Sequence, residues 1–186
     1  MYVTVSDGLG VGVVLGGELV RGQHNIAGEF GHVPLNVDGP RCGCGARGCL
    51  EAYVSNLATL SRYFGRDSRD RAPTADTSMT IDDLIARARG GDAKALDALL
   101  ATARYLGLGL GSVVNAIDPS QVYLGGEITA AWDLIEASVR SGLAERALTP
   151  PAGATPITVV PPEQYPRLRG AAALIAAPSF AKEVVA

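Results

Sequence analysis

Hydrophobic and polar positions alternate at the start of the chain, which is typical of β-structure. Residues 2–5, Tyr-Val-Thr-Val, are aromatic or β-branched and predict a strand, and a second apolar run covers residues 11–15. Gly8 and Gly10 are expected to break these two strands apart, and a later Gly-Gly turn leads into a third. The N-terminal segment is therefore predicted to be an antiparallel meander. Because this meander opens directly at residue 1, we expect the chain to be a piece of a longer protein.

Further along the chain, apolar residues recur at the spacing of amphipathic helices. A short helix is expected to begin near Cys49. Thr80 is a predicted N-cap for a helix over residues 81–89, and Asp92 begins a longer one. The longer helix has one apolar face, formed by Leu96, Leu99, Leu100, Ala103, Leu106, Leu110, Val113 and Val114. It also contains three glycines, Gly107, Gly109 and Gly111. Each costs about 1 kcal/mol relative to Ala in a helix interior, so we expect them to permit close packing against a neighbouring element or ligand.

The last third of the chain alternates between strands and helices. Asp118-Pro119 ends the long helix, and residues 121–128 read as a buried strand with a Gly-Gly turn. A helix over about 129–147, a strand at 157–161 and an Ala-rich helix over about 167–177 follow. This order predicts α/β architecture with parallel strand pairing. The apolar faces of the long helix and of the final helix are expected to form core, with part of that surface exposed or used in dimerisation.

Composition and charge narrow the class of protein. The chain has 186 residues, of which 47% are hydrophobic and 19% charged, so we expect a single domain over residues 1–186 with a real core. The net charge of −3 argues against direct binding of nucleic acid by this chain. Neither a membrane span nor a signal peptide is expected, which favours a cytoplasmic location. Residues 65–80 are charged and polar, and we interpret them as a solvated loop.

Every cysteine of the chain lies in one short segment, PRCGCGARGCLE, from Pro40 to Glu51. Cys42 and Cys44 are too close in sequence for an ordinary disulfide, whereas Cys44 and Cys49 could form one and leave Cys42 free. The spacing also differs from the C-x-x-C of redox motifs. In a reducing cytoplasm the disulfide interpretation is the weaker one.

A metal site explains the segment better. Glycines between the cysteines let the backbone turn several sulfurs toward one point, and the flanking Arg41 and Arg47 would favour thiolates. A structural zinc site needs a fourth ligand from Cys or His, and the chain has two histidines, His24 and His32. We prefer His32, because the turn signals Asp38-Gly39-Pro40 can reverse the chain between it and the cysteines. The predicted ligands are His32, Cys42, Cys44 and Cys49. A reduced, metal-free loop with a packed histidine is the alternative.

Two glutamates bracket this segment, Glu29 three residues before His32 and Glu51 two residues after Cys49. A closed four-ligand zinc site leaves no open position for catalysis, so the metal would serve as scaffolding. Two carboxylates and an imidazole edge then form a cluster suited to the vicinal hydroxyls of a sugar. The alternative for each glutamate is an ordinary exposed side chain.

The stretch AGEFGHVPLNVDGPRCGCGARGCLEAYVS resembles the signature of the ROK family, which contains bacterial sugar-responsive repressors and sugar kinases. Its signature residues are all present, Gly28, Glu29, Gly31, His32, Cys42, Cys44, Gly48, Cys49, Leu50 and Glu51. The segments DGLGVGVVLGGELVRG and VNAIDPSQVYLGGE are also similar to the family. We name residues 28–51 the Cys/His loop.

The resemblance implies a fold, a metal and a ligand. The fold is the C-terminal lobe of an actin-like (sugar kinase or ribonuclease H-like) α/β fold, with a mixed sheet packed with helices and a zinc loop. It implies zinc at the four residues named above, and a sugar or sugar phosphate contacted by Glu29, His32 and Glu51. The family's first lobe, with its catalytic aspartate, and the repressors' helix-turn-helix have no counterpart here. This chain alone is therefore expected neither to phosphorylate a sugar nor to bind DNA, which would require a further domain. A homo-oligomer is also expected.

The glycine-rich SDGLGVG separates the two branches of the family. The kinases typically have Gly-Thr-Gly-Ile-Gly-Gly-Gly there, facing the ATP phosphates. This chain has Ser6 and Asp7 in place of the Gly-Thr pair, and Val11 in place of a glycine. A carboxylate at Asp7 repels polyphosphate, and a β-branched residue limits close backbone approach. We interpret Asp7, Gly8 and Gly10 as a degenerate phosphate loop. The chain is thus expected to be most like the NagC/XylR-type regulators. A kinase half and a ligand-free zinc domain remain as alternatives.

Overall fold

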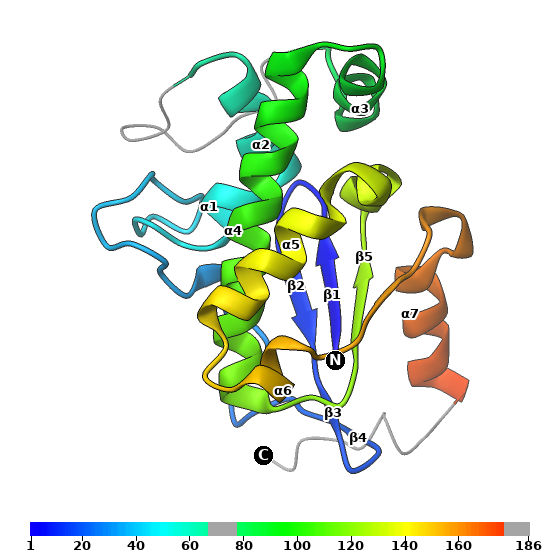
Figure 1. Cartoon of the computed structure of the whole chain (residues 1–186). Helices are drawn as coiled ribbons and strands as arrows, with labels where there is room; N and C mark the ends of the chain where they lie inside the picture. The colour runs from blue at the N-terminus through cyan, green and yellow to red at the C-terminus, as the bar shows by residue number, and fades with distance from the viewer. Residues whose placement is uncertain (67–77, 177–186) are drawn as a thin grey trace.

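The computed structural model describes residues 1–66 and 78–176, and its centre is a mixed four-stranded sheet packed against helices (Figure 1). The first pair of strands is antiparallel, and the other two pairs are parallel. In spatial order the strands are β2 (Leu9–Gly12), β1 (Tyr2–Val5), β5 (Val122–Gly125) and β6 (Ile157–Val159). The predicted α/β class and the parallel pairing are therefore confirmed.

The N-terminal meander divides between two sheets. β1 and β2 pair in the main sheet, whereas β3 (Val14–Leu15) and β4 (Glu18–Leu19) form a separate hairpin. The expectation that Gly10 breaks the strands was wrong, because Gly10 lies inside β2 and pairs with Thr4 of β1. A Cβ on Gly10 would lie 3.3 Å from the Thr4 methyl group, so a glycine fits a close pair of neighbouring strands.

The α-helices begin and end close to the predicted residues, because their capping residues are unambiguous. The helix over 81–89 has a capping box between Thr80 and Asp83, and Asp92 caps the long helix through the backbone N–H of Ala95. The α-helices are α1 (Glu51–Val54), α2 (Asn56–Tyr63), α3 (Ile81–Arg89), α4 (Ala93–Ile117), α5 (Trp132–Arg146), α6 (Pro150–Gly153) and α7 (Pro166–Ala176). Within residues 1–66 and 78–176 they are accompanied by the 3-10 helices η1 (Phe30–His32), η2 (Glu127–Ala131) and η3 (Pro162–Gln164).

One predicted helix begins differently from the expectation, and one short helix was not predicted. The helix expected over 129–147 begins with the 3-10 turn η2 and becomes α5 at Trp132. The short helix α6 was not predicted, although Thr149 caps it and prolines occupy its first turn. Most of the predicted loop at 65–80 and the last residue of the final predicted helix lie outside the described residues.

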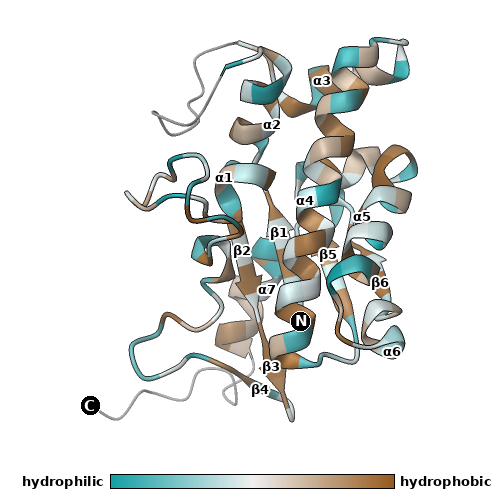
Figure 2. Cartoon of the chain, turned by 60° about the vertical axis from the view of Figure 1, so that its left-hand side comes forward, coloured by the Kyte–Doolittle hydropathy of each residue, from teal (hydrophilic) through white to brown (hydrophobic). Residues whose placement is uncertain are grey.

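The core lies between one face of the sheet and the helices α4 and α5. Alternate strand residues point into it and are fully buried, namely Val3, Val5, Val122 and Leu124. The apolar face of α4 meets them with Leu99, Leu106 and Leu110. Figure 2 shows hydrophobic residues along these strands and the adjoining turns of α4. The prediction that the long helix forms core is therefore confirmed.

The final helix does not form core, in contrast to the prediction. α7 contains no buried residue, and Leu168 and Ile175 are exposed. It lies on the other side of the sheet from α4, where its first turn borders Tyr2 and Thr4 (Figure 1). Its alanines favour helix formation, but their small side chains supply little apolar surface that could pack against the sheet. The described helices include none that is both long and apolar enough to cross a membrane.

The glycines of α4 allow close packing, as predicted. A Cβ on Gly107 would lie 2.2 Å from the carbonyl oxygen of Val139 in α5, and one on Gly111 would strike Arg146 and Leu143 of the same helix. A Cβ on Gly109 would strike the side chain of Leu50, which belongs to the Cys/His loop. The long helix thus packs backbone to backbone against α5 and also supports the loop.

We expect Gly107→Ala to lower the free energy of unfolding by about 1–3 kcal/mol, because the added methyl group must push α4 and α5 apart. Gly170→Ala in α7 is the matched control, since nothing lies within 4 Å of its added Cβ. That control should be neutral or stabilising by up to about 1 kcal/mol. Urea denaturation of both variants measures the difference, and equal unfolding free energies would contradict the close packing of the two helices.

Candidate metal centre

The Cys/His loop folds back on itself because its two ends pair. The backbone N–H of Leu50 donates to the carbonyl oxygen of Val33, and the N–H of Leu35 donates to that of Gly48. Gly48 has a φ of +70°, and a Cβ there would overlap the carbonyl of Asn36, so a glycine is required at this position. These contacts bring the segment that follows η1 alongside the segment that precedes α1.

The start of the loop lies against β2. Gly28 has a φ of +97°, and a Cβ on it would lie 2.1 Å from the carbonyl oxygen of Val11. A Cβ on Gly31 would lie 2.6 Å from the carbonyl oxygen of Leu9. These two glycines therefore let η1, and with it His32, approach the strand backbone more closely than any other residue type would allow.

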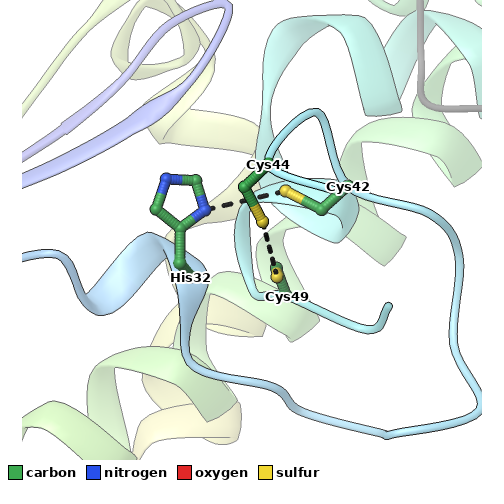
Figure 3. A group of neighbouring side chains, drawn as sticks. All are labelled: His32, Cys42, Cys44 and Cys49. Atoms are coloured by element: carbon green, nitrogen blue, oxygen red, sulfur yellow. Dashed lines mark hydrogen bonds between the residues drawn. The ribbon is translucent and has the colours of Figure 1, made fainter. Parts of the chain in front are cut away.

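The four predicted ligands converge, as Figure 3 shows. One ligand atom from each of His32, Cys42, Cys44 and Cys49 lies within 4.8 Å of all the others. The Cys42 sulfur lies 3.7 Å from Nδ1 of His32, and the sulfurs of Cys44 and Cys49 are also 3.7 Å apart. Tetrahedral zinc, with bonds of about 2.3 Å to sulfur and 2.0 Å to nitrogen, places its ligands about 3.5–3.8 Å apart. The cluster can therefore hold a metal ion.

The structure contains no disulfide within the cluster. All three cysteines are free, and 3.7 Å is far longer than the roughly 2.05 Å of a sulfur–sulfur bond. His24, the other histidine, is exposed and is not among the clustered ligands. The choice of His32 over His24 is consistent with this geometry.

The environment of the thiols differs from the one expected from the flanking arginines. Burial raises the pKa of Cys42 to about 12, and burial also raises the pKa of Cys49. The pKa of the exposed Cys44 is lowered, chiefly by the backbone N–H of Ala46. Burial, rather than Arg41 or Arg47, therefore has the largest effect on the pKa of Cys42 and of Cys49, and a bound cation would have to supply the energy that ionises these two thiols.

The two glutamates have different environments. Glu29 immediately precedes η1, and its side chain is 62% exposed, with Oε2 lying 3.8 Å from Nε2 of His32. Glu51 is the first residue of α1 and is half-buried. Its Oε2 accepts a hydrogen bond from the backbone N–H of Leu9 (2.9 Å), and its Oε1 accepts one from the Cys42 thiol (3.6 Å). Both carboxylates therefore border the Cys/His cluster, Glu29 beside His32 and Glu51 beside Cys42.

The predicted phosphate loop connects β1 to β2. Asp7 is exposed at the tip of this turn, and the N–H of Ser6 is already donated to the carbonyl oxygen of Gly8. Glu51 reaches the turn from the Cys/His loop, since a Cβ on Gly8 would lie 2.7 Å from its Oε2. The turn thus carries carboxylates on two sides, and part of its backbone N–H groups are already bonded within the protein.

A polar cluster beside this turn was missed by the sequence reasoning. Asn56, at the start of α2, donates from Nδ2 to Oε2 of Glu127, which follows the Gly-Gly turn of β5. Burial raises the pKa of Glu127, but hydrogen bonds from its own backbone, Ser6 and Asn56, together with Arg167, lower it below its ordinary value overall. The Gly-Gly-Glu sequence was the available signal, because it places a polar residue at the carboxyl end of a parallel strand.

Comparison with known proteins gives one consistent family. The ROK family matches residues 1–177. The xylose repressor of Bacillus subtilis is 34% identical over 146 residues, which are 78% of this chain and 36% of that protein. A solved ROK family transcriptional regulator, a homolog of the E. coli MLC protein, is 31% identical with a TM-score of 0.72, covering 86% of this chain and 40% of that one.

A kinase is also among the similar structures. The ROK family glucokinase from Streptomyces griseus, solved in complex with glucose and AMPPNP, is 29% identical with a TM-score of 0.68. The match covers 85% of this chain and 54% of that one. Across these three proteins the chain spans between about a third and about a half of the relative's length.

Proposed function

This chain belongs to the ROK family, and from that membership we propose that it is the sugar-effector-binding and oligomerisation domain of a transcriptional regulator. In this proposal a structural zinc holds the residues that contact the sugar. The observation that carries the proposal is the convergence of the Cys/His cluster between two carboxylates, together with a carboxylate at the tip of the β1–β2 turn.

Zinc is the metal that best suits this donor set. Three thiolates and one imidazole are typical of closed tetrahedral zinc sites, whereas Mg²⁺ and Ca²⁺ require oxygen ligands. His32 would bind through Nδ1, the nitrogen that faces Cys42. Such a site has no open coordination position, so the metal would stabilise the loop and would not take part in chemistry.

The sugar contacts would come from Glu29, His32 and Glu51. With Nδ1 on the metal, Nε2 of His32 carries the proton and can donate to a hydroxyl group. Carboxylates accept hydrogen bonds from hydroxyl groups, and each such charge-assisted bond contributes about 1.5–3 kcal/mol. The exposure of Glu29 and the position of Nε2 beside it support a ligand at this face of the loop.

The β1–β2 turn favours a regulator over a kinase. A polyphosphate at this turn would face the exposed carboxylate of Asp7, and like charges at short range repel unless they are strongly screened. The similarity to a glucokinase solved with glucose and AMPPNP supports the alternative function, the C-terminal half of an ATP-dependent sugar kinase. A sugar-independent zinc domain is the third possibility.

Regulation would act by changing the relative populations of different arrangements of the lobes or subunits. A sugar that binds between this chain and a first lobe would favour one arrangement of lobes or subunits, and so change the affinity of a separate DNA-binding domain. The exposed apolar residues Val14 and Leu15 on the β3–β4 hairpin support a role for this chain in contacts between copies or lobes.

A nucleotide titration separates regulator from kinase. We expect AMPPNP, titrated by calorimetry into the full-length product of the gene with Mg²⁺ and glucose present, to give no binding heat. The same protein is expected to bind a DNA fragment from its own promoter, with an affinity that changes on addition of a monosaccharide. Saturable AMPPNP binding, together with ATP-dependent sugar phosphorylation and no promoter binding, would support the kinase instead.

A further inference from the structure

Arg62 of α2 has a half-buried guanidinium group without a carboxylate partner among the described residues. It donates instead to neutral oxygens, to Oγ1 of Thr102, to the carbonyl of Ala98 (3.4 Å) and to the carbonyl of Tyr53 (2.9 Å). The guanidinium also lies 5.6 Å from the ring centroid of Tyr105. Burying a cation is unfavourable unless its donors are satisfied. Because Arg62 is partly buried, we infer that it has a structural role in addition to keeping the surface soluble.

The hydrogen bond from Arg62 to the carbonyl of Tyr53 is the most informative of these contacts, because Tyr53 lies in the last turn of α1. This helix has four residues, Glu51–Val54, which is far too short to be stable alone. Tyr53 supplies one of its last carbonyl groups, which have no partner within the helix. A cation that donates to such a carbonyl also interacts favourably with the negative end of the helix. Arg62 therefore fixes the C-terminal end of α1.

The side chain of Tyr53 ties the same helix to the Cys/His loop and to α4. Its ring packs against Tyr105 of α4, with the centroids 4.6 Å apart. Its hydroxyl group lies directly against Gly39, where a Cβ would come within 2.1 Å of it. Arg62 thus holds a helix that is connected at its other end to Cys49 and that begins with Glu51.

We propose that Arg62 is a positioning residue, which fixes α1 so that the Glu51 carboxylate stays beside Leu9 and the Cys/His cluster. Without it α1 keeps the packing of Tyr53 against Tyr105 but loses the hydrogen bond to its last turn, so its C-terminal end is held less firmly and Glu51 leaves its place more often. The consequence for ligand affinity rests on the proposed function, whereas the consequence for the position of Glu51 does not.

The Leu9 amide reports this position directly, because its N–H donates to Oε2 of Glu51. Amide hydrogen exchange of the zinc-loaded chain should be compared for Arg62→Met, Arg62→Lys and Arg104→Met. Arg104 is the matched control, an exposed arginine of α4 that pairs with Glu145 on the surface. The amide of Val122, which donates to the carbonyl of Pro156 in the core sheet, measures global stability in the same samples.

We expect Arg62→Met to accelerate Leu9 exchange tenfold or more relative to Arg104→Met, with Val122 changed less than twofold and one zinc retained per chain. Arg62→Lys, which keeps one donor for Tyr53, should restore most of the protection. In the full-length gene product, Arg62→Met should raise the dissociation constant for the effector sugar at least tenfold.

Two results would overturn the proposal. One is Leu9 exchange equal to that of the Arg104→Met control, and the other is equal acceleration of Leu9 and Val122, which would mean general destabilisation. If Leu9 exchange rises while sugar affinity stays unchanged, the role of Arg62 in ligand binding is refuted. A wild-type protein that binds no sugar counts against the proposed function alone, because the amide exchange still decides whether Arg62 positions Glu51.

Discussion

Replacing His32 with Ala is expected to abolish metal binding and to lower the melting temperature of the chain by about 6–20 °C. The reason is that three sulfurs cannot complete a closed tetrahedral site, so the Cys/His loop loses the cross-link between η1 and the start of α1. Structural zinc contributes about 10–16 kcal/mol in small zinc-finger peptides. This loop is also held by backbone pairing, so we expect the loss to be about 3–5 kcal/mol, at roughly 2–4 °C per kcal/mol for a chain of this size.

The chain offers a matched control for this prediction, because it has a second histidine. His24 is exposed and lies outside the cluster, so His24→Ala should keep one zinc per chain and the wild-type melting temperature. Elemental analysis and differential scanning calorimetry of the two variants, both purified without added metal, measure the effect. Equal zinc content in the two variants would show that His32 is not a metal ligand.

Replacing Glu51 with Gln is expected to weaken sugar binding by about 10–150-fold. Loss of one charge-assisted hydrogen bond removes about 1.5–3 kcal/mol, and 1.4 kcal/mol corresponds to a tenfold change in affinity. Glutamine keeps an oxygen that can accept the N–H of Leu9, so the fold and the metal content should be unaffected. Calorimetric titration of the full-length gene product with its effector monosaccharide gives the two dissociation constants.

The control is Glu136→Gln, since Glu136 forms a surface ion pair with Arg140 four residues along α5. Exposed pairs of this kind contribute little, so this variant should bind sugar like the wild type. Glu29→Gln should weaken binding in the same direction as Glu51→Gln. A Glu51→Gln protein with wild-type affinity would mean that the half-buried carboxylate only joins the loop to the β1–β2 turn.

Elements defined by local chemistry were predictable from the sequence. Thr80 and Asp92 mark the starts of α3 and α4 because an N-cap side chain bonds to backbone groups within three residues of itself. The Cys/His cluster was predictable for a similar reason, since its ligands lie within eighteen positions of one another and only a few residue types bind zinc.

Elements defined by distant partners were not predictable. The position of Glu51 depends on the backbone of Leu9, forty-two residues earlier, and Arg62 is defined by Tyr53 and by Thr102 of another helix. Gly10 looked like a strand breaker because its partner, Thr4, is not visible in a local pattern. The alanines of α7 looked like core, although burial depends on what packs against a helix as well as on its own composition.

In the proposed function the metal organises the sugar site, which is tested by measuring sugar binding with and without the metal. The full-length gene product should be titrated with its effector monosaccharide as purified, after removal of the metal by a chelator, and after zinc is restored. We predict that removal weakens binding at least tenfold and that zinc restores it, because the loop that holds His32 and Glu51 is then cross-linked again. Equal affinity in all three states would mean that the metal does not organise the sugar site.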